Sequence, residues 1–102
     1  RLFMERKSIT KKSLENYESF LRQEEKSQAT VEKYLREIRV LSVFMKGAKI
    51  SKPKILEYRE RLIETYQPKT VNTKLSAINS YLEFSGLSSC VVKLLKIQRQ
   101  RL

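Results

Sequence analysis

Residues 68–87 read Pro-Lys-Thr-Val-Asn-Thr-Lys-Leu-Ser-Ala-Ile-Asn-Ser-Tyr-Leu-Glu-Phe-Ser-Gly-Leu, and this stretch decides the fold. Its aliphatic residues recur at spacings of four, three and four, the pattern of one buried face of an α-helix. We therefore expect a helix over residues 70–85, capped by Thr70, entered through Pro68 and ended by a left-handed residue at Gly86. The residues on its buried face are Val71, Leu75, Ile78 and Leu82.

The opposite face of this helix is polar and lacks carboxylates. No acidic residue occurs between Glu64 and Glu83. Hydroxyl, amide and amino groups can donate hydrogen bonds to phosphates or base edges, and no carboxylate on this face repels a polyanion. The composition therefore favours contact with a nucleic acid. The side chains concerned are those of Lys69, Asn72, Thr73, Ser76, Asn79 and Ser80.

Three further helices are expected upstream, over residues 14–25, 28–46 and 52–66. Each has an apolar stripe at helical spacing and a polar residue suited to its N-terminus. Together with residues 70–85 they predict an all-α fold, a compact bundle of four main helices with basic extended tails. The expected N-terminal residues are Ser13, Ser27 and either Ser51 or Lys52, with Pro53 in the first turn of the third helix.

An internal similarity suggests how the helices are arranged. The pattern that begins at Thr30 is partly repeated forty residues later at Thr70. We interpret this as two similar helical hairpins packed together, with the second and fourth helices presenting corresponding ends to one side. Residues 40–45 are apolar nearly all round and should lie at the centre of the fold. Residues 87–92 could form a short fifth helix or an extended cover.

The charge is uneven along the chain. There are 22 Lys and Arg residues against 11 acidic ones, a formal net charge of +11. Residues 1–13 hold five bases and one acid, and residues 93–102 hold four bases and no acid. Basic ends on a nearly balanced body favour a polyanionic partner, with nucleic acid first and an anionic membrane surface second.

Several kinds of chemistry are absent from the sequence. It has no histidine and two glycines, which argues against His-based catalysis, His metal sites and a Gly-rich phosphate loop. The single cysteine, Cys90, cannot form an intrachain disulfide, which fits a reducing compartment. No apolar run reaches the roughly 20 residues of a membrane helix. We expect no catalytic residue, no metal and no cofactor.

Residues 14–95 resemble the N-terminal core-binding domain of tyrosine recombinases, the phage-integrase-like enzymes of bacteria and mobile elements. The resemblance lies in the order and spacing of motifs rather than in any single one. In chain order the motifs are Tyr17-x-x-Phe20-Leu21, Ser27-x-x-Thr30-Val31-x-x-Tyr34-x-x-x-Ile38 and Thr70-Val71-x-x-x-Leu75-Ser76-Ala77-Ile78-x-x-Tyr81-x-x-Phe84.

The resemblance implies a SAM-like bundle whose helices over residues 28–46 and 70–85 face DNA and help to clamp the duplex. It implies a basic leader at residues 1–12, a core-binding domain at residues 13–92 and a linker at residues 93–102. The implied partners are double-stranded DNA, a C-terminal catalytic domain of the same protein and other recombinase subunits, with no membrane or small-molecule substrate. The implied location is the bacterial cytoplasm, at the nucleoid. The family's catalytic histidine has no counterpart here, so the chain is expected to be a DNA-binding fragment and not an active enzyme.

The predicted site combines cations with short polar side chains. Asn72, Thr73 and Ser76 are the candidates for base edges in the major groove. The other members are expected to contact phosphates, through their side chains or through backbone amides at helix starts. They are Ser27, Thr30, Lys33, Arg36, Lys69, Thr70, Lys74, Lys93, Lys96 and Arg99.

Two other classes of function stay open on the residues alone. A membrane binder would need a basic amphipathic helix with bulky apolar anchors, which the sequence lacks. A helical protein-interaction module could dock a partner helix but would not explain the carboxylate-free face. Its candidate contacts are Ala77, Phe84, Leu94, Leu95 and Ile97.

Overall fold

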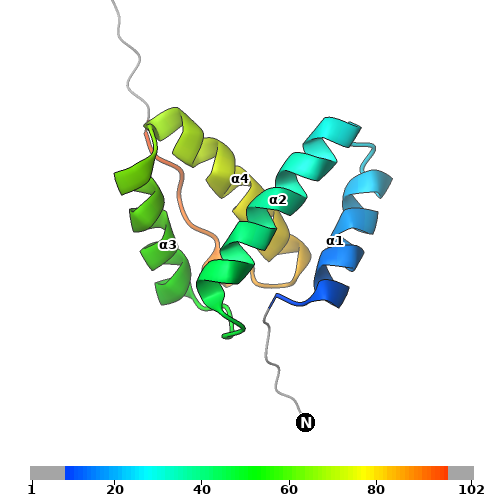
Figure 1. Cartoon of the computed structure of the whole chain (residues 1–102), viewed down its shortest axis with the longest axis horizontal. Coiled ribbons are helices and arrows are strands. Elements are labelled where there is room, and N and C mark those ends of the chain that lie inside the picture. The colour runs from blue at the N-terminus through cyan, green and yellow to red at the C-terminus, as the bar shows by residue number, and fades with distance from the viewer. Residues whose placement is uncertain (1–8, 97–102) are drawn as a thin grey trace, which may run out of the picture.

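The computed structural model describes residues 9–96, which form two helical hairpins packed against each other (Figure 1). α1 pairs with α2 and α3 with α4, and α2 packs on α4 to join the two hairpins. Within these residues there is no strand, and the predicted all-α bundle is confirmed. In Figure 1 both α2 and α4 begin at the top, so corresponding ends lie on one side as the internal similarity predicts. The elements are α1 (Lys11–Gln23), α2 (Gln28–Met45), α3 (Lys52–Thr65), α4 (Pro68–Phe84) and the 3₁₀ helix η1 (Ser88–Cys90).

The start of α1 differs from the prediction. The helix begins at Lys11, inside the stretch predicted to be a leader, because Thr10 and Ser13 form a reciprocal capping box. The Ser13 N–H donates to Thr10 Oγ1 at 3.0 Å, and the Thr10 N–H donates to Ser13 Oγ at 2.9 Å. At α2 the expected cap is confirmed, since Ser27 Oγ accepts from the Thr30 N–H at 3.2 Å.

α3 and α4 both begin at a proline-containing first turn. Ser51 is the N-cap residue of α3, with Pro53 following as predicted. α4 begins at Pro68 and not near Thr70, because the fixed φ of proline suits the first helical position. Thr70 therefore lies inside the first turn and is not the cap. The residue before the helix, Gln67, makes no capping bond with its side chain.

The end of α4 follows the glycine signal. Gly86 has a φ of 78°, its N–H donates to the Glu83 carbonyl at 3.2 Å, and the Leu87 N–H donates to the Leu82 carbonyl at 2.7 Å. These two bonds form a Schellman motif. α1 closes in the same way, but there the left-handed position is occupied by Glu25, with a φ of 62°.

The core fills the space between the four helices. The predicted aliphatic face of α4 is fully buried. The prediction for residues 40–45 was wrong in part, because Val43 is 74% exposed and Val40 is 48% exposed. Tyr66, the C-cap residue of α3, is 43% exposed. These three residues line an open groove between the C-terminal half of α2 and α3.

Four aromatic rings connect α1 to α4 across the end of the bundle. The Tyr17 and Tyr81 rings meet edge to face, with centroids 5.2 Å apart, and the Phe20 and Phe84 centroids lie 4.9 Å apart. The Tyr17 hydroxyl donates to Ser80 Oγ at 2.8 Å. Burial raises the pKa of Tyr17 to about 12, although its hydrogen bond with Ser80 acts in the opposite direction. This phenol is therefore neutral at ordinary pH.

Candidate nucleic-acid interface

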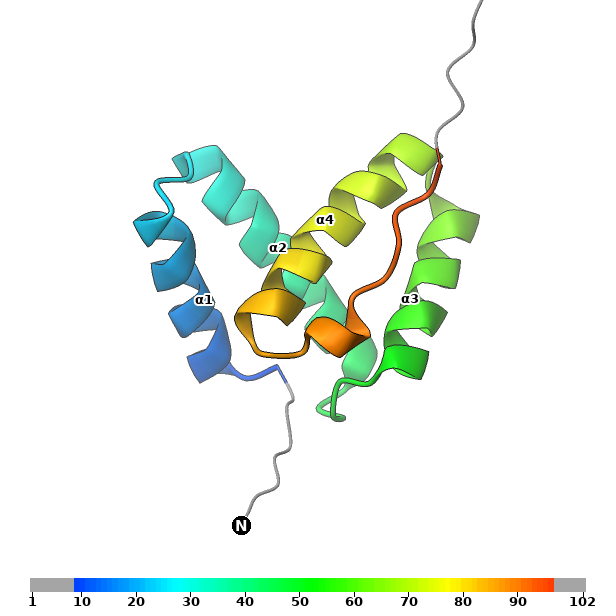
Figure 2. The ribbon, with the colours of Figure 1, turned by 180° about the vertical axis from the view of Figure 1, so that it is seen from behind.

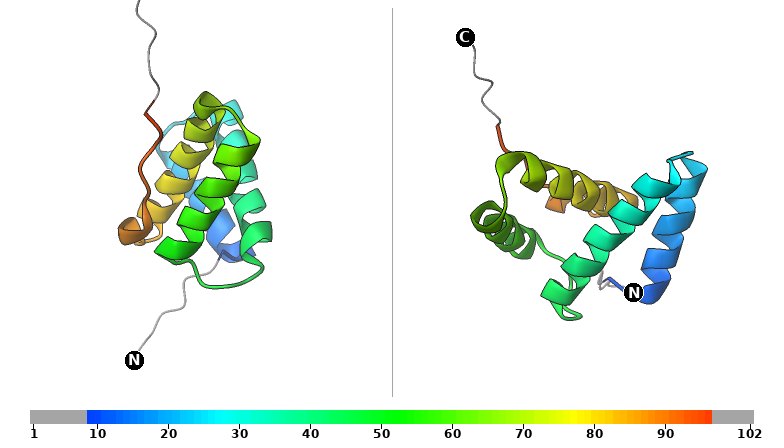
Figure 3. Two further views of the ribbon diagram at one scale, coloured as in Figure 1. Left: turned by 90° about the vertical axis from the view of Figure 1, so that its left-hand side faces the viewer. Right: turned by 45° about the horizontal axis from the view of Figure 1, so that its top comes forward.

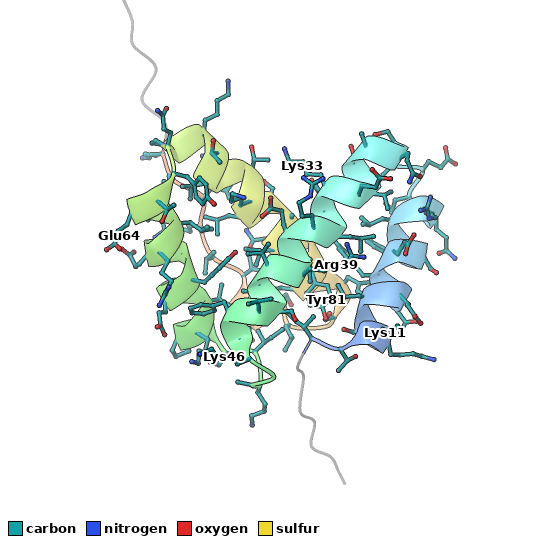
Figure 4. The ribbon with its side chains drawn as sticks, viewed as in Figure 1. Lys11, Lys33, Arg39, Lys46, Glu64 and Tyr81 are labelled. Atoms are coloured by element: carbon teal, nitrogen blue, oxygen red, sulfur yellow. The ribbon has the colours of Figure 1, made fainter. Side chains whose placement is uncertain are left out.

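A small groove lies between α2 and α4, near the ends where both helices begin. It contains five of the predicted site residues, so residues forty positions apart in sequence share one surface. Figure 4 shows Lys33 projecting from α2 toward the opening between the two helices. The groove is lined by Lys33, Arg36 and Glu37 from α2 and by Thr70, Thr73 and Lys74 from α4.

Three cations at this edge are available to a ligand. Lys33, Arg36 and Lys69 are exposed, and no ion pair within residues 9–96 involves any of them. Thr70 is exposed as well, on the first turn of α4. The edge therefore presents positive charge together with hydrogen-bond donors, which suits an anionic backbone.

Lys74 is paired with an acid of α2. Its Nζ donates to both carboxylate oxygens of Glu37, at 3.0 and 3.2 Å, and lies 4.7 Å from the centre of the Tyr66 ring. Glu37 is 5% exposed. Residues 68–82 of α4 carry no carboxylate, but α2 supplies one to this part of the helix. The phosphate contact expected of Lys74 stays a prediction, and in this structure its ammonium group is engaged by Glu37.

Asn72 is hydrogen-bonded to the C-terminal segment, and its expected role as a base reader stays a prediction. Its Nδ2 donates to the Leu95 carbonyl at 3.0 Å, and its Oδ1 accepts from the Leu95 N–H at 2.7 Å. Asn72 lies on the flank of α4 that faces the C-terminal segment, whereas Thr73 lies in the groove with Lys33. Thr73 donates its hydroxyl to the Lys69 carbonyl at 3.1 Å and can still accept a hydrogen bond.

The remaining polar candidates fall into two groups. Ser27 is exposed and Thr30 is half-buried at the start of α2, where their hydroxyls bond to each other at 3.0 Å. Ser76 is half-buried on α4, two turns from the helix start. The positions of these three residues argue neither for nor against contact with a duplex.

Residues 91–96, which we call the strap, follow η1 in an extended conformation. Figure 2 shows the strap running between α3 and α4. Figure 3 (left) shows it on one side of α4 while α2 lies on the other side, so the strap and the groove flank the same helix. Lys93 and Lys96 of the strap are exposed. Arg99, the last predicted phosphate contact, lies outside the described residues.

A second groove, which sequence reasoning missed, lies between the C-terminal half of α2 and α3. Val43 and Tyr66 expose apolar surface there, and the Phe44 ring lies beneath two cations, Lys54 at 5.8 Å and Arg61 at 5.2 Å from its centre. The sequence held a signal for this groove, because residues 40–45 are apolar nearly all round, but we interpreted that pattern as burial at the centre of the fold. We call it the α2–α3 groove.

The surface predicted for a partner helix is mostly covered. Ala77 is 1% exposed, Phe84 packs in the aromatic cluster and Leu95 is half-buried. Leu94 is 45% exposed, and Ile97 lies outside the described residues. This part of the protein-interaction prediction is therefore not supported.

Comparison with known proteins identifies one family. Residues 6–86 match the family model described as phage integrase, N-terminal SAM-like domain. The matched region contains α1 to α4 and therefore both grooves. Comparisons with curated proteins and with solved structures found no match. Among the helices of residues 9–96, none has the length and apolar character needed to span a membrane.

Proposed function

The chain belongs to the phage integrase N-terminal SAM-like domain family, and we propose that it binds duplex DNA as the core-binding part of a tyrosine recombinase. The observation that carries the proposal is the groove between α2 and α4, which is lined by Lys33 and Arg36, together with Lys69 exposed on the first turn of α4. The family match covers an N-terminal domain and includes no catalytic one. The proposed activity is therefore binding, with cleavage and joining carried out by a separate catalytic domain.

The two helix starts add to the attraction for phosphate. The first N–H groups of a helix lack intrahelical partners, and the helix dipole places a partial positive charge there. At α4 no side chain caps these groups, because Gln67 makes no capping bond. A phosphate at this position would accept from backbone N–H groups while Lys69 and Lys33 neutralise its charge.

The proposed contacts divide into those that position the protein and those that read sequence. Lys33, Arg36 and Lys69 contact phosphates, and Lys93, Lys96 and Arg99 follow the backbone along the strap side. Because Asn72 is hydrogen-bonded to the strap, the side chains proposed to contact base edges are those of Thr70, Thr73 and Ser76. The helix start formed by Ser27 and Thr30 anchors a second phosphate position. Other recombinase subunits and the catalytic domain complete the proposed clamp.

Salt dependence tests this proposal directly. If about six phosphates are neutralised, the log of the association constant should fall with log salt with a slope of about −5. The assay is fluorescence anisotropy of a labelled random-sequence duplex at several salt concentrations. A flat salt dependence, or no binding at low salt, would refute the proposal.

A matched pair of lysine variants locates the interface. Lys69 lies at the proposed edge, whereas Lys49 is exposed in the loop after α2, at the other end of that helix. Lys69→Gln should weaken binding to every duplex and make the salt slope shallower by about one. Lys49→Gln removes the same charge and should leave the slope unchanged. Equal losses for the two variants would mean that net charge alone attracts the DNA.

The α2–α3 groove favours a second candidate function, docking of a partner helix. Three cations, Lys46, Lys54 and Arg61, surround its apolar floor, while Glu57 is the one acid that lines it. The occupant that fits is an amphipathic helix with apolar anchors flanked by acidic residues. This function is compatible with DNA binding, because the groove at the helix starts is separate from it.

A designed peptide tests this second candidate. The probe is a labelled helical peptide with Leu at positions i, i+4 and i+7 and Glu between them, compared with a peptide in which every Glu is Lys. The acidic peptide should bind, and Val43→Glu should abolish its binding without changing DNA affinity. Equal binding of both peptides, or no effect of Val43→Glu, would contradict the assignment.

A further inference from the structure

The strap is held to α4 by the side-chain amides of two asparagines. Each amide hydrogen-bonds to the backbone of one strap residue. Asn79 donates to the Val92 carbonyl at 2.9 Å and accepts from the Val92 N–H at 3.1 Å. Asn72 does the same to Leu95, at 3.0 and 2.7 Å. In an extended chain the N–H and C=O of one residue point to the same side, so a single carboxamide can satisfy both.

The spacing of the two asparagines matches the spacing of the two strap residues. Asn72 and Asn79 are two helical turns apart, about 10.5 Å along α4 at about 1.5 Å per residue. Val92 and Leu95 are three residues apart in an extended chain, about 9–10 Å. Moving the strap by one residue would break all four hydrogen bonds and would also move the Val92 and Leu95 side chains out of their places against the core, so the bonds and the two apolar side chains together fix one register.

Two side chains of α3 bind the same backbone from the other side. Lys52 Nζ donates to the Val91 carbonyl at 2.7 Å, and Arg59 Nε donates to the Lys93 carbonyl at 3.0 Å. All of these bonds reach backbone atoms, so the strap is recognised as a chain and not through its polar side chains. The side chains of Lys93 and Lys96 stay exposed.

We propose that Asn72 and Asn79 are positioning residues that lock the strap in one register and thereby hold Lys93 and Lys96 at fixed points beside α4. The effect on DNA rests on the proposed function, whereas the lock itself does not. A cation on a fixed backbone loses less conformational freedom when it meets a phosphate than one on a loose tail. The two asparagines act on DNA only through the strap.

Amide hydrogen exchange on the whole chain tests the lock without DNA. The N–H groups of Val92 and Leu95 should exchange slowly, while those of Lys93, Leu94 and Lys96 should exchange at rates close to those of an unstructured chain. Fast exchange at both Val92 and Leu95, or uniform protection along the strap, would overturn the proposal.

Variants of the asparagines make the prediction residue-specific. Asn72→Ala should release the Leu95 amide and leave Val92 protected by Asn79. Asn72→Asp keeps the oxygen acceptor and should retain most of the protection at Leu95. Asn16→Ala, at an exposed position on α1, is the matched control and should change neither amide. Loss of protection at both sites in every variant, the control included, would show general destabilisation and overturn the specific lock.

DNA affinity then tests the positioning role. The variant Asn72→Ala/Asn79→Ala should bind DNA roughly threefold to tenfold more weakly than the wild type. In a background of Lys93→Gln/Lys96→Gln the same two changes should have no further effect. An undiminished effect in that background would overturn the role of these lysines. Slow exchange in a chain that binds no DNA would leave the lock standing, refute the proposed function and remove the positioning role.

Discussion

Replacing Lys74 with methionine should destabilise the fold. Methionine keeps the length of the side chain and its contact with the Tyr66 ring, but it leaves the Glu37 carboxylate buried without a partner. Removing one member of a buried ion pair costs about 3–5 kcal/mol. Such a loss is a large part of the stability of a domain of this size.

We therefore expect Lys74→Met to lower the free energy of unfolding by about 3–5 kcal/mol. Glu37→Leu/Lys74→Met replaces the whole pair with apolar groups and should recover most of the loss.

Urea denaturation followed by circular dichroism measures this loss and its recovery in the double variant. A loss below about 1 kcal/mol would refute the reasoning from burial. The double variant also tests the function assigned to Lys74. If the lysine is structural, this variant binds DNA as the wild type does; if it contacts phosphate, affinity falls although stability has returned.

Other predictions concern single positions. Glu25→Gly should stabilise the fold by about 0.5–1 kcal/mol in urea denaturation, because Glu25 has a φ of 62°. Gly86→Ala should destabilise the fold by about 1 kcal/mol, because alanine disfavours the left-handed conformation that Gly86 adopts. A stability change of the same sign in both variants would contradict this reasoning. Burial raises the pKa of Tyr17 to about 12, whereas unfolded tyrosine titrates near 10. The free energy of unfolding should therefore fall as the pH rises from about 10 to 12. Tyr17→Phe should make this fall shallower by about 1.4 kcal/mol per pH unit, which unfolding measured at several pH values checks.

The fold could be read from the sequence where the signal is local. The aliphatic spacing of α4, the cap at Ser27 and the turn at Gly86 each involve residues within a few positions of one another, and all three are confirmed. The starts of α1 and α4 were misplaced because two local signals competed. At α4 the fixed φ of Pro68 outweighed the capping tendency of Thr70.

The candidate site was predicted less completely, because its geometry depends on contacts between distant segments. Lys74 meets an acid 37 positions earlier in the chain, and Asn72 meets a backbone 23 positions later. Nothing in the pattern of α4 distinguishes an asparagine that reads a base from one that holds a strap. By contrast, Lys33 and Thr70 could be placed together, because the similarity between the two hairpins predicts that their helix starts lie on one side.

The aromatic contact between α1 and α4 bears on how the chain is made. Its two tyrosine hydroxyl bonds join residues 63 and 68 positions apart, Tyr17 with Ser80 and Tyr81 with Ser13. During synthesis α1 leaves the ribosome first, yet the rings that bury Tyr17 and Phe20 emerge only with the end of α4. The side of α1 that carries Tyr17 and Phe20 therefore lacks these partners until α4 has emerged, and a chaperone that shields it would act in that interval.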